Sequence, residues 1–78
     1  MELIKEFEKV VNQLNVSNHI KILLKNSFKR TEKDIYYYEE LGNHISTLYL
    51  FNIFDDIEYD KLMDILQKQI DILVLLDN

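Results

Sequence analysis

Apolar side chains recur at intervals of three to four residues along most of this sequence, and no proline interrupts the pattern. An α-helix has about 3.6 residues per turn, so this spacing places the apolar side chains on one helical face. With 78 residues, the chain is long enough for one core and too short for two domains. We therefore expect an all-α fold, in which residues 1–78 form a single helical-bundle domain of three to four helices connected up-and-down through short loops.

Local signals place the first two helices. The apolar stripe near the start of the chain predicts a helix over Glu2–Leu14, and a second stripe predicts a helix that runs to about Lys29. A short polar segment separates them. In it, either Asn15 or Ser17 is expected to act as N-cap and accept a hydrogen bond from the first amides of the second helix.

A third helix is expected to follow. Thr31, followed at the third position by Asp34, resembles a capping box, which predicts a helix start near Glu32. Gly42 and Asn43 leave two alternatives open, because the helix either continues through them or ends in a left-handed residue before a new helix begins. The residues expected on its inner face are Ile35, Tyr38, Leu41, Ile45, Leu48 and Tyr49.

The last helix has the sharpest start signal in the sequence. Asp55 and Glu58 form a D-x-x-E variant of the capping box, which predicts a helix over Asp56–Leu76. Before it, every residue from Leu48 to Phe54 except Asn52 is apolar. A helix that is apolar all round must be covered on more than one side, so we expect this segment to have two sets of neighbours.

The absence of cysteine bears on how so small a domain is stabilised. A lone core of this size rarely supplies more than about 3 to 5 kcal/mol, and neither disulfides nor cysteine-ligated metals can add to it here. Association with a second copy is the remaining way to bury more apolar surface. We therefore expect a homodimer, with an interface drawn from the surplus apolar residues Leu50, Phe51, Phe54, Ile72 and Leu76.

Charge is distributed unevenly along this acidic chain, whose net charge is −5. Residues 1–33 carry seven basic against four acidic residues, whereas residues 34–78 carry two basic against ten acidic residues. At helical spacing the acidic residues Asp56, Asp60 and Asp64 form one row, and a basic row on the second helix consists of Lys21, Lys25 and Lys29, followed by Arg30. Both rows can be solvated faces. As binding surfaces, the acidic row predicts a protein partner with a basic surface, and the basic row predicts the alternative of nucleic-acid contact.

Three consecutive tyrosines, residues 36–38, cannot all face one core, because on a helix they spread over about 200°. At least one of them is expected to be exposed or to lie at an interface. Tyrosine is enriched in binding hot spots, so Tyr36 and Tyr37 join the acidic row as candidate partner-binding residues. Since a chain with net charge −5 is repelled by nucleic acid, the basic protein partner is the preferred interpretation.

No pattern in the sequence is typical of catalysis, of a cofactor or of a metal site. His19 and His44 are the only side chains with an ordinary pKa near neutrality, and neither lies in a catalytic motif. Glu40 and His44 are four residues apart and would share a helical face, but two ligands are too few for a metal site. We therefore expect no enzymatic activity, no cofactor and no catalytic or metal-ligating residues.

The start of the chain and the overall composition complete the sequence-based expectations. The first residues alternate between charged and apolar and lack the features of a secretory signal, so a cytoplasmic location without membrane association is expected. Abundant Ile, Lys and Asn together with the absence of Ala indicate AT-rich coding, typical of low-GC bacteria and their phages or plasmids. The function expected is that of a small protein-protein interaction module that inhibits or regulates a host protein. The alternative is a small dimeric regulator that associates with nucleic acid through its second helix.

Overall fold

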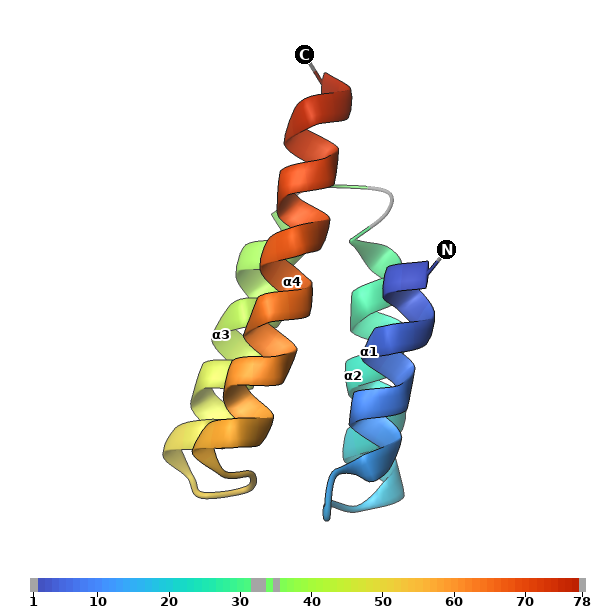
Figure 1. Ribbon diagram of the computed structural model, residues 1–78. Helices are drawn as coiled ribbons and strands as arrows, with labels where there is room; N and C mark the ends of the chain where they lie inside the picture. Colours follow the sequence, from blue (N-terminus) through green and yellow to red (C-terminus); the bar gives the residue numbers. More distant parts are fainter. Residues whose placement is uncertain (1, 32–33, 35, 78) are drawn as a thin grey trace.

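Four α-helices account for nearly all of the residues that the computed structural model describes, which are 2–31, 34 and 36–77 (Figure 1). They are α1 (Glu2–Gln13), α2 (Asn18–Arg30), α3 (Tyr36–Leu50) and α4 (Asp56–Asp77), and these described residues contain no strand. α1 and α3 each pack against both α2 and α4, so the helices form a ring around a shared core. The expectation of an all-α fold with up to four helices is confirmed. α4 is the longest helix, and its last turns extend beyond the starts of α1 and α3 (Figure 1).

The core draws on every helix. Phe7 of α1 and Phe28 of α2 stack with their ring centroids 4.2 Å apart and their planes inclined by 14°. Both rings are almost completely buried. The other buried apolar residues are Val11, Leu14, Leu24, Tyr38, Leu41, Ile45, Phe54, Leu62, Ile65 and Leu66. A single cluster therefore connects all four helices, as burial of one apolar face from each helix requires.

The boundaries of the first two helices agree with the sequence signals to within one residue. α1 ends at Gln13, one residue before the expected end. Of the two N-cap candidates for α2, the structure selects Ser17, whose side-chain oxygen accepts a hydrogen bond from the Ile20 amide at 3.3 Å. Asn15 lies before this cap and is exposed.

The prediction that Thr31 starts the third helix is wrong, because Thr31 is the C-cap of α2. Its hydroxyl donates to the Phe28 carbonyl at 2.5 Å, and the whole residue is buried. The predicted start at Glu32 lies outside the described residues, and α3 begins at Tyr36. Asp34, the other half of the proposed capping box, instead accepts a hydrogen bond from the Tyr36 amide at 2.9 Å.

α3 passes through Gly42 without a break, which decides between the two alternatives in favour of a continuous helix. Gly42 does not adopt a positive φ, so it does not terminate the helix. A Cβ built at this position would lie 3.6 Å from the Leu66 side chain, an ordinary contact. Tyr38, Leu41 and Ile45 are buried as expected for the inner face, whereas Leu48 and Tyr49 are partly buried and Ile35 lies outside the described residues.

α3 ends at Leu50, inside the apolar run, so the expected helix that is apolar all round and covered on more than one side does not form over residues 48–54. Asn52 has a φ of 60°, the left-handed conformation that ends many helices. The Ile53 amide donates to the Leu48 carbonyl at 3.0 Å, and the Asn52 amide donates to the Tyr49 carbonyl at 2.9 Å. These two bonds form a Schellman motif, in which Asn52 occupies the position usually taken by glycine.

The capping box at the start of α4 is confirmed by two reciprocal hydrogen bonds. The Glu58 amide donates to the Asp55 carboxylate at 2.8 Å, and the Asp55 amide donates to the Glu58 carboxylate at 2.9 Å. The α3–α4 turn is therefore fixed at both ends, by the Schellman motif before it and by the capping box after it.

Candidate functional site

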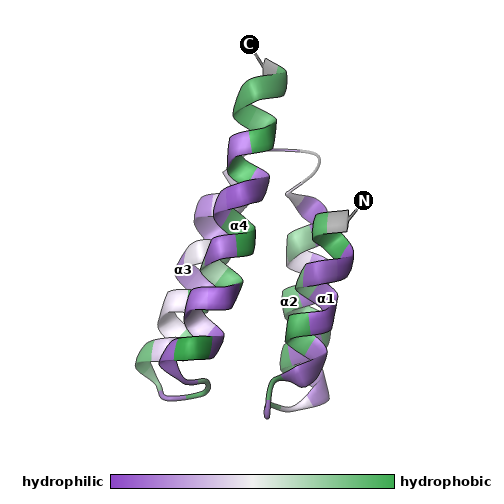
Figure 2. Cartoon of the chain, in the orientation of Figure 1, coloured by the Kyte–Doolittle hydropathy of each residue, from purple (hydrophilic) through white to green (hydrophobic). Residues whose placement is uncertain are grey.

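Large apolar side chains are exposed at the α3–α4 turn, where hydrophobic (green) and hydrophilic (purple) residues lie next to one another in Figure 2. The exposed fractions are 76% for Leu50, 72% for Phe51 and 36% for Ile53. Acidic residues lie beside them, and Leu50 lines one open hollow together with Asp55 and Asp56. We define the turn surface as Leu50, Phe51, Ile53, Asp55, Asp56 and Asp60.

The rigidity of the turn explains why these side chains stay exposed. A flexible loop can fold its apolar side chains back onto the core. Here backbone–backbone hydrogen bonds hold the first end of the turn, and the carboxylates of Asp55 and Glu58 accept hydrogen bonds from backbone amides at the second end. Phe54 is the exception, because it is only 5% exposed and anchors the turn in the core. Keeping a leucine or phenylalanine side chain in water forgoes roughly 1.5–3 kcal/mol that burial would contribute. An exposed, rigid apolar patch with a polar rim is typical of an interaction site.

Two stacked tyrosines lie next to the acidic residues of the turn surface, and one of them donates a hydrogen bond to Asp56. The rings of Tyr49 and Tyr59 stack with their centroids 4.3 Å apart, which connects the end of α3 to the start of α4. The Tyr49 hydroxyl donates a hydrogen bond to the Asp56 carboxylate. This hydrogen bond, together with the negative charges of Asp56 and Asp60, raises the pKa of Tyr49 above its ordinary value. From the sequence, Tyr49 was expected on the inner face of its helix, and neither tyrosine was a candidate partner-binding residue.

Replacing Asp56 by asparagine is expected to lower the pKa of Tyr49 toward its ordinary value near 10, because the charged acceptor is lost. In the parent protein the folded state holds this proton more tightly than the unfolded state. The stability that this contributes is therefore fully present below about pH 10 and is lost as pH rises through the raised folded pKa. NMR titration of the tyrosine ring signals measures the shift. In the control Asp60→Asn the decrease should be smaller, since Asp60 acts only through its charge, and an equal decrease would contradict the hydrogen bond as the main cause.

Comparison with known proteins does not assign the chain to a family. No family model matches it, and the searches of curated proteins and of solved structures find no similar chain.

The candidate partner-binding residues do not form one surface. Asp56, Asp60 and Asp64 are all exposed on α4, as the predicted acidic row requires. Tyr36 is 68% exposed, but it lies at the start of α3 beside Ile70, which follows the last residue of the acidic row by about 9 Å along α4. Tyr37 is partly buried and faces a groove between α2 and α3. The tyrosines near the acidic row are instead Tyr49 and Tyr59.

The candidate dimer-interface residues are also divided between two places. Leu50 and Phe51 lie in the turn surface, whereas Ile72 and Leu76 lie near the opposite end of α4, which is also hydrophobic in Figure 2. Phe54 is buried in the chain's own core and is therefore not available to a second copy.

Within the residues that the structure describes, no helix combines the length and apolar character needed to span a bilayer.

The basic row on α2 is partly engaged within the chain. The Lys21 ammonium donates to the Asn12 carbonyl at 3.0 Å, and both Lys21 and Lys25 are partly buried. Lys29 is exposed, and Arg30 lines the groove between α2 and α3. The basic row therefore consists of two partly buried lysines followed by the exposed Lys29 and Arg30.

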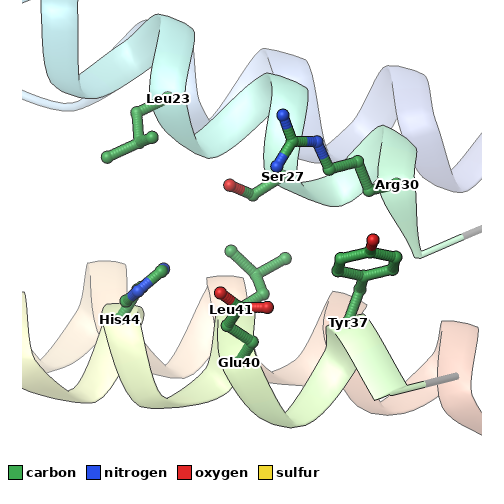
Figure 3. A pocket seen from close by; sticks show the side chains of 7 residues that line it. All are labelled: Leu23, Ser27, Arg30, Tyr37, Glu40, Leu41 and His44. Carbon is green, nitrogen blue, oxygen red and sulfur yellow. The ribbon is translucent and has the colours of Figure 1, made fainter. Parts of the chain in front are cut away.

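Glu40 and His44 do lie together, in the groove between α2 and α3 (Figure 3). Ser27 and Arg30 line the opposite side of this groove, which has a volume of about 90 Å³. The permanent positive charge of Arg30 disfavours a metal cation here. Among the described residues, no group of three or more histidine, cysteine or acidic side chains is placed to hold a metal ion.

Proposed function

We propose that this chain is a non-enzymatic protein-binding module and that the turn surface contacts its partner. The observation that carries the proposal is the exposure of Leu50 and Phe51 on a turn held rigid by hydrogen bonds at both ends. A preorganised turn loses little backbone conformational entropy on binding, so more of the contact energy of its exposed side chains is retained as affinity.

The rim of the turn surface indicates the chemistry of the partner. Asp55, Asp56 and Asp60 place three carboxylates beside the apolar side chains, and all three are exposed. A matching partner surface has an apolar pocket surrounded by lysine or arginine side chains. Opposite charges at the rim accelerate and orient the encounter, while the buried apolar anchors determine how long the complex lasts.

The biological setting belongs to the same proposal. The AT-rich coding bias supports a low-GC bacterium, or one of its phages or plasmids, as the source, with a cytoplasmic host protein as the partner that is inhibited or regulated. The proposal includes an up-and-down connection of the four helices, since short loops place consecutive helices antiparallel. It also includes a homodimer, because a core of this size gains stability from a second copy.

Binding should be lost when the apolar anchors of the turn surface are made polar. The experiment compares the parent chain with the variant Leu50→Ser/Phe51→Ser as baits for a host lysate, and then measures the affinity of the captured protein for each bait. We expect affinity to fall by at least about a hundredfold, because two exposed anchors worth roughly 1.5–3 kcal/mol each are removed.

The matched control is Ile22→Ser on α2, which removes an apolar side chain that is 56% exposed and distant in sequence from the turn surface. It should leave binding unchanged. Equal losses in the control and the turn variant would contradict the turn surface as the site. Shifting of duplex DNA by the parent chain at physiological salt would instead favour the regulator that uses α2.

A further inference from the structure

A regular pattern runs along the outer face of α4, on the side that no other helix covers. Its six residues follow one another at alternating intervals of four and three, which is the heptad spacing of a coiled-coil seam. They are Ile57, Lys61, Asp64, Lys68, Asp71 and Leu75, and together they define the α4 stripe. All six are exposed.

The ends of the α4 stripe are apolar, although they face solvent. Ile57 is 66% exposed and Leu75 is 75% exposed. Between them the stripe is entirely charged, with Lys61 and Lys68 as the only basic residues of α4. Within the chain, Lys68 pairs with Asp64 at 3.2 Å on the surface. Such an exposed pair contributes little stability by itself.

The charges of the α4 stripe are complementary to those of a second, antiparallel copy. With a two-fold axis at the level of residue 66, positions equally far from it on either side face each other. Ile57 then faces Leu75 of the second copy, and Lys61 faces Asp71 of the second copy. Asp64 faces Lys68 of the second copy. The two-fold axis generates each of these three contacts twice. The interface therefore contains two apolar layers and four layers in which opposite charges face each other.

Parallel pairing does not have this property. In a parallel, in-register pair each residue faces its own counterpart, so lysine meets lysine and aspartate meets aspartate in every charged layer. Placing like charges opposite each other is unfavourable, and this selects one orientation among the possible pairs. The charge complementarity therefore indicates a second copy of this chain as the partner of the α4 stripe, in the antiparallel orientation.

We infer that the α4 stripe is the interface of an antiparallel homodimer, formed by α4 of one copy against α4 of the other. This inference rests on the homodimer included in the proposed function and is separate from the turn surface. It differs from the dimer residues expected from sequence, because the symmetric seam pairs the exposed side chains of Ile57 and Leu75, which lie near the two ends of α4.

The test measures the mass of the full chain by sedimentation equilibrium over a range of concentrations. The parent protein should approach twice the chain mass of 9.4 kDa as concentration rises. Lys61→Glu places an acidic residue opposite Asp71 in two layers and should weaken dimerisation by at least about tenfold. Adding Asp71→Lys to that variant restores opposite charges and should return the dimerisation constant close to the parent value.

The rescue reports on contacts between copies, because residues 61 and 71 are about 15 Å apart along one helix and cannot pair within a chain. The matched control is Lys9→Glu, which makes the same change in net charge at an exposed position of α1 and should leave dimerisation near the parent value. All of these positions are exposed, so the circular dichroism spectra of the variants should show the helix content of the parent.

The possible failures have different meanings. A protein that stays monomeric at every concentration overturns both this inference and the proposed homodimer. A dimer that Lys61→Glu does not weaken, or that Asp71→Lys does not rescue, overturns the α4 stripe but leaves the homodimer standing. Neither result bears on partner binding, which the Leu50→Ser/Phe51→Ser variant tests through the turn surface.

Discussion

Replacing Phe28 by alanine is expected to leave the chain largely unfolded at physiological temperature. Phe28 is 1% exposed and stacks on Phe7, so its removal leaves a cavity between α1 and α2. Phenylalanine-to-alanine changes in a core cost about 3–5 kcal/mol. The core of a domain this small rarely supplies more than about 3–5 kcal/mol in total, so the loss is comparable to the whole stability.

Circular dichroism during urea and thermal unfolding measures this effect. The control is Ile22→Ala on the same helix, whose side chain is 56% exposed and which should change stability by less than about 0.5 kcal/mol. A Phe28→Ala variant that kept most of the parent stability would show that the contact between α1 and α2 does not depend on the stacked rings.

The starts of α2 and α4 were predicted correctly from polar capping residues, which are Ser17 for α2 and the Asp55–Glu58 capping box for α4. Asp55 and Glu58 form both of their expected hydrogen bonds, because each side chain lies within reach of the other's amide. Thr31 has the same apparent signature. Its hydroxyl instead bonds backward to Phe28, since a buried threonine at the end of α2 can reach that carbonyl in the preceding turn. Sequence spacing alone does not distinguish the two directions.

The end of α3 could not be predicted from the apolar character of the residues around it. From their apolar character, residues 48–54 resemble one continuous buried segment in which Asn52 is an exception. Asparagine is the residue that most readily replaces glycine in the left-handed conformation, so Asn52 was itself the stop signal. This one residue converts a helix that would need covering on two sides into a turn that exposes Leu50 and Phe51.

The candidate site could be predicted only in part because its members come from two helices. The acidic row follows from the spacing within α4, which is a local property. Its neighbours depend on how α3 packs against α4. That packing brings Tyr49 to Asp56 and leaves Tyr36 beside Ile70, and no signal in the sequence fixes this register.

Replacing Gln69 by methionine is expected to stabilise the protein by about 1–2 kcal/mol. Gln69 is 3% exposed, and its Oε1 atom accepts no hydrogen bond from the residues that the structure describes. A buried acceptor without a donor costs about 1–3 kcal/mol, whereas a methionine thioether has little need of one. Methionine also has nearly the same shape and helix propensity as glutamine, so the substitution changes polarity with little change in packing or backbone preference.

Thermal unfolding of Gln69→Met should show a rise of several degrees in Tm for a domain of this size. The matched control is Gln67→Met on the same helix, where the parent side chain is exposed and donates to Asp71 at 3.0 Å. Since this hydrogen bond is in contact with water, its loss should change stability by less than about 0.5 kcal/mol. If Gln69→Met lowered Tm instead, the Gln69 carbonyl would have to be satisfied in solution, and the α4 core would then contain a polar contact that contributes to its stability.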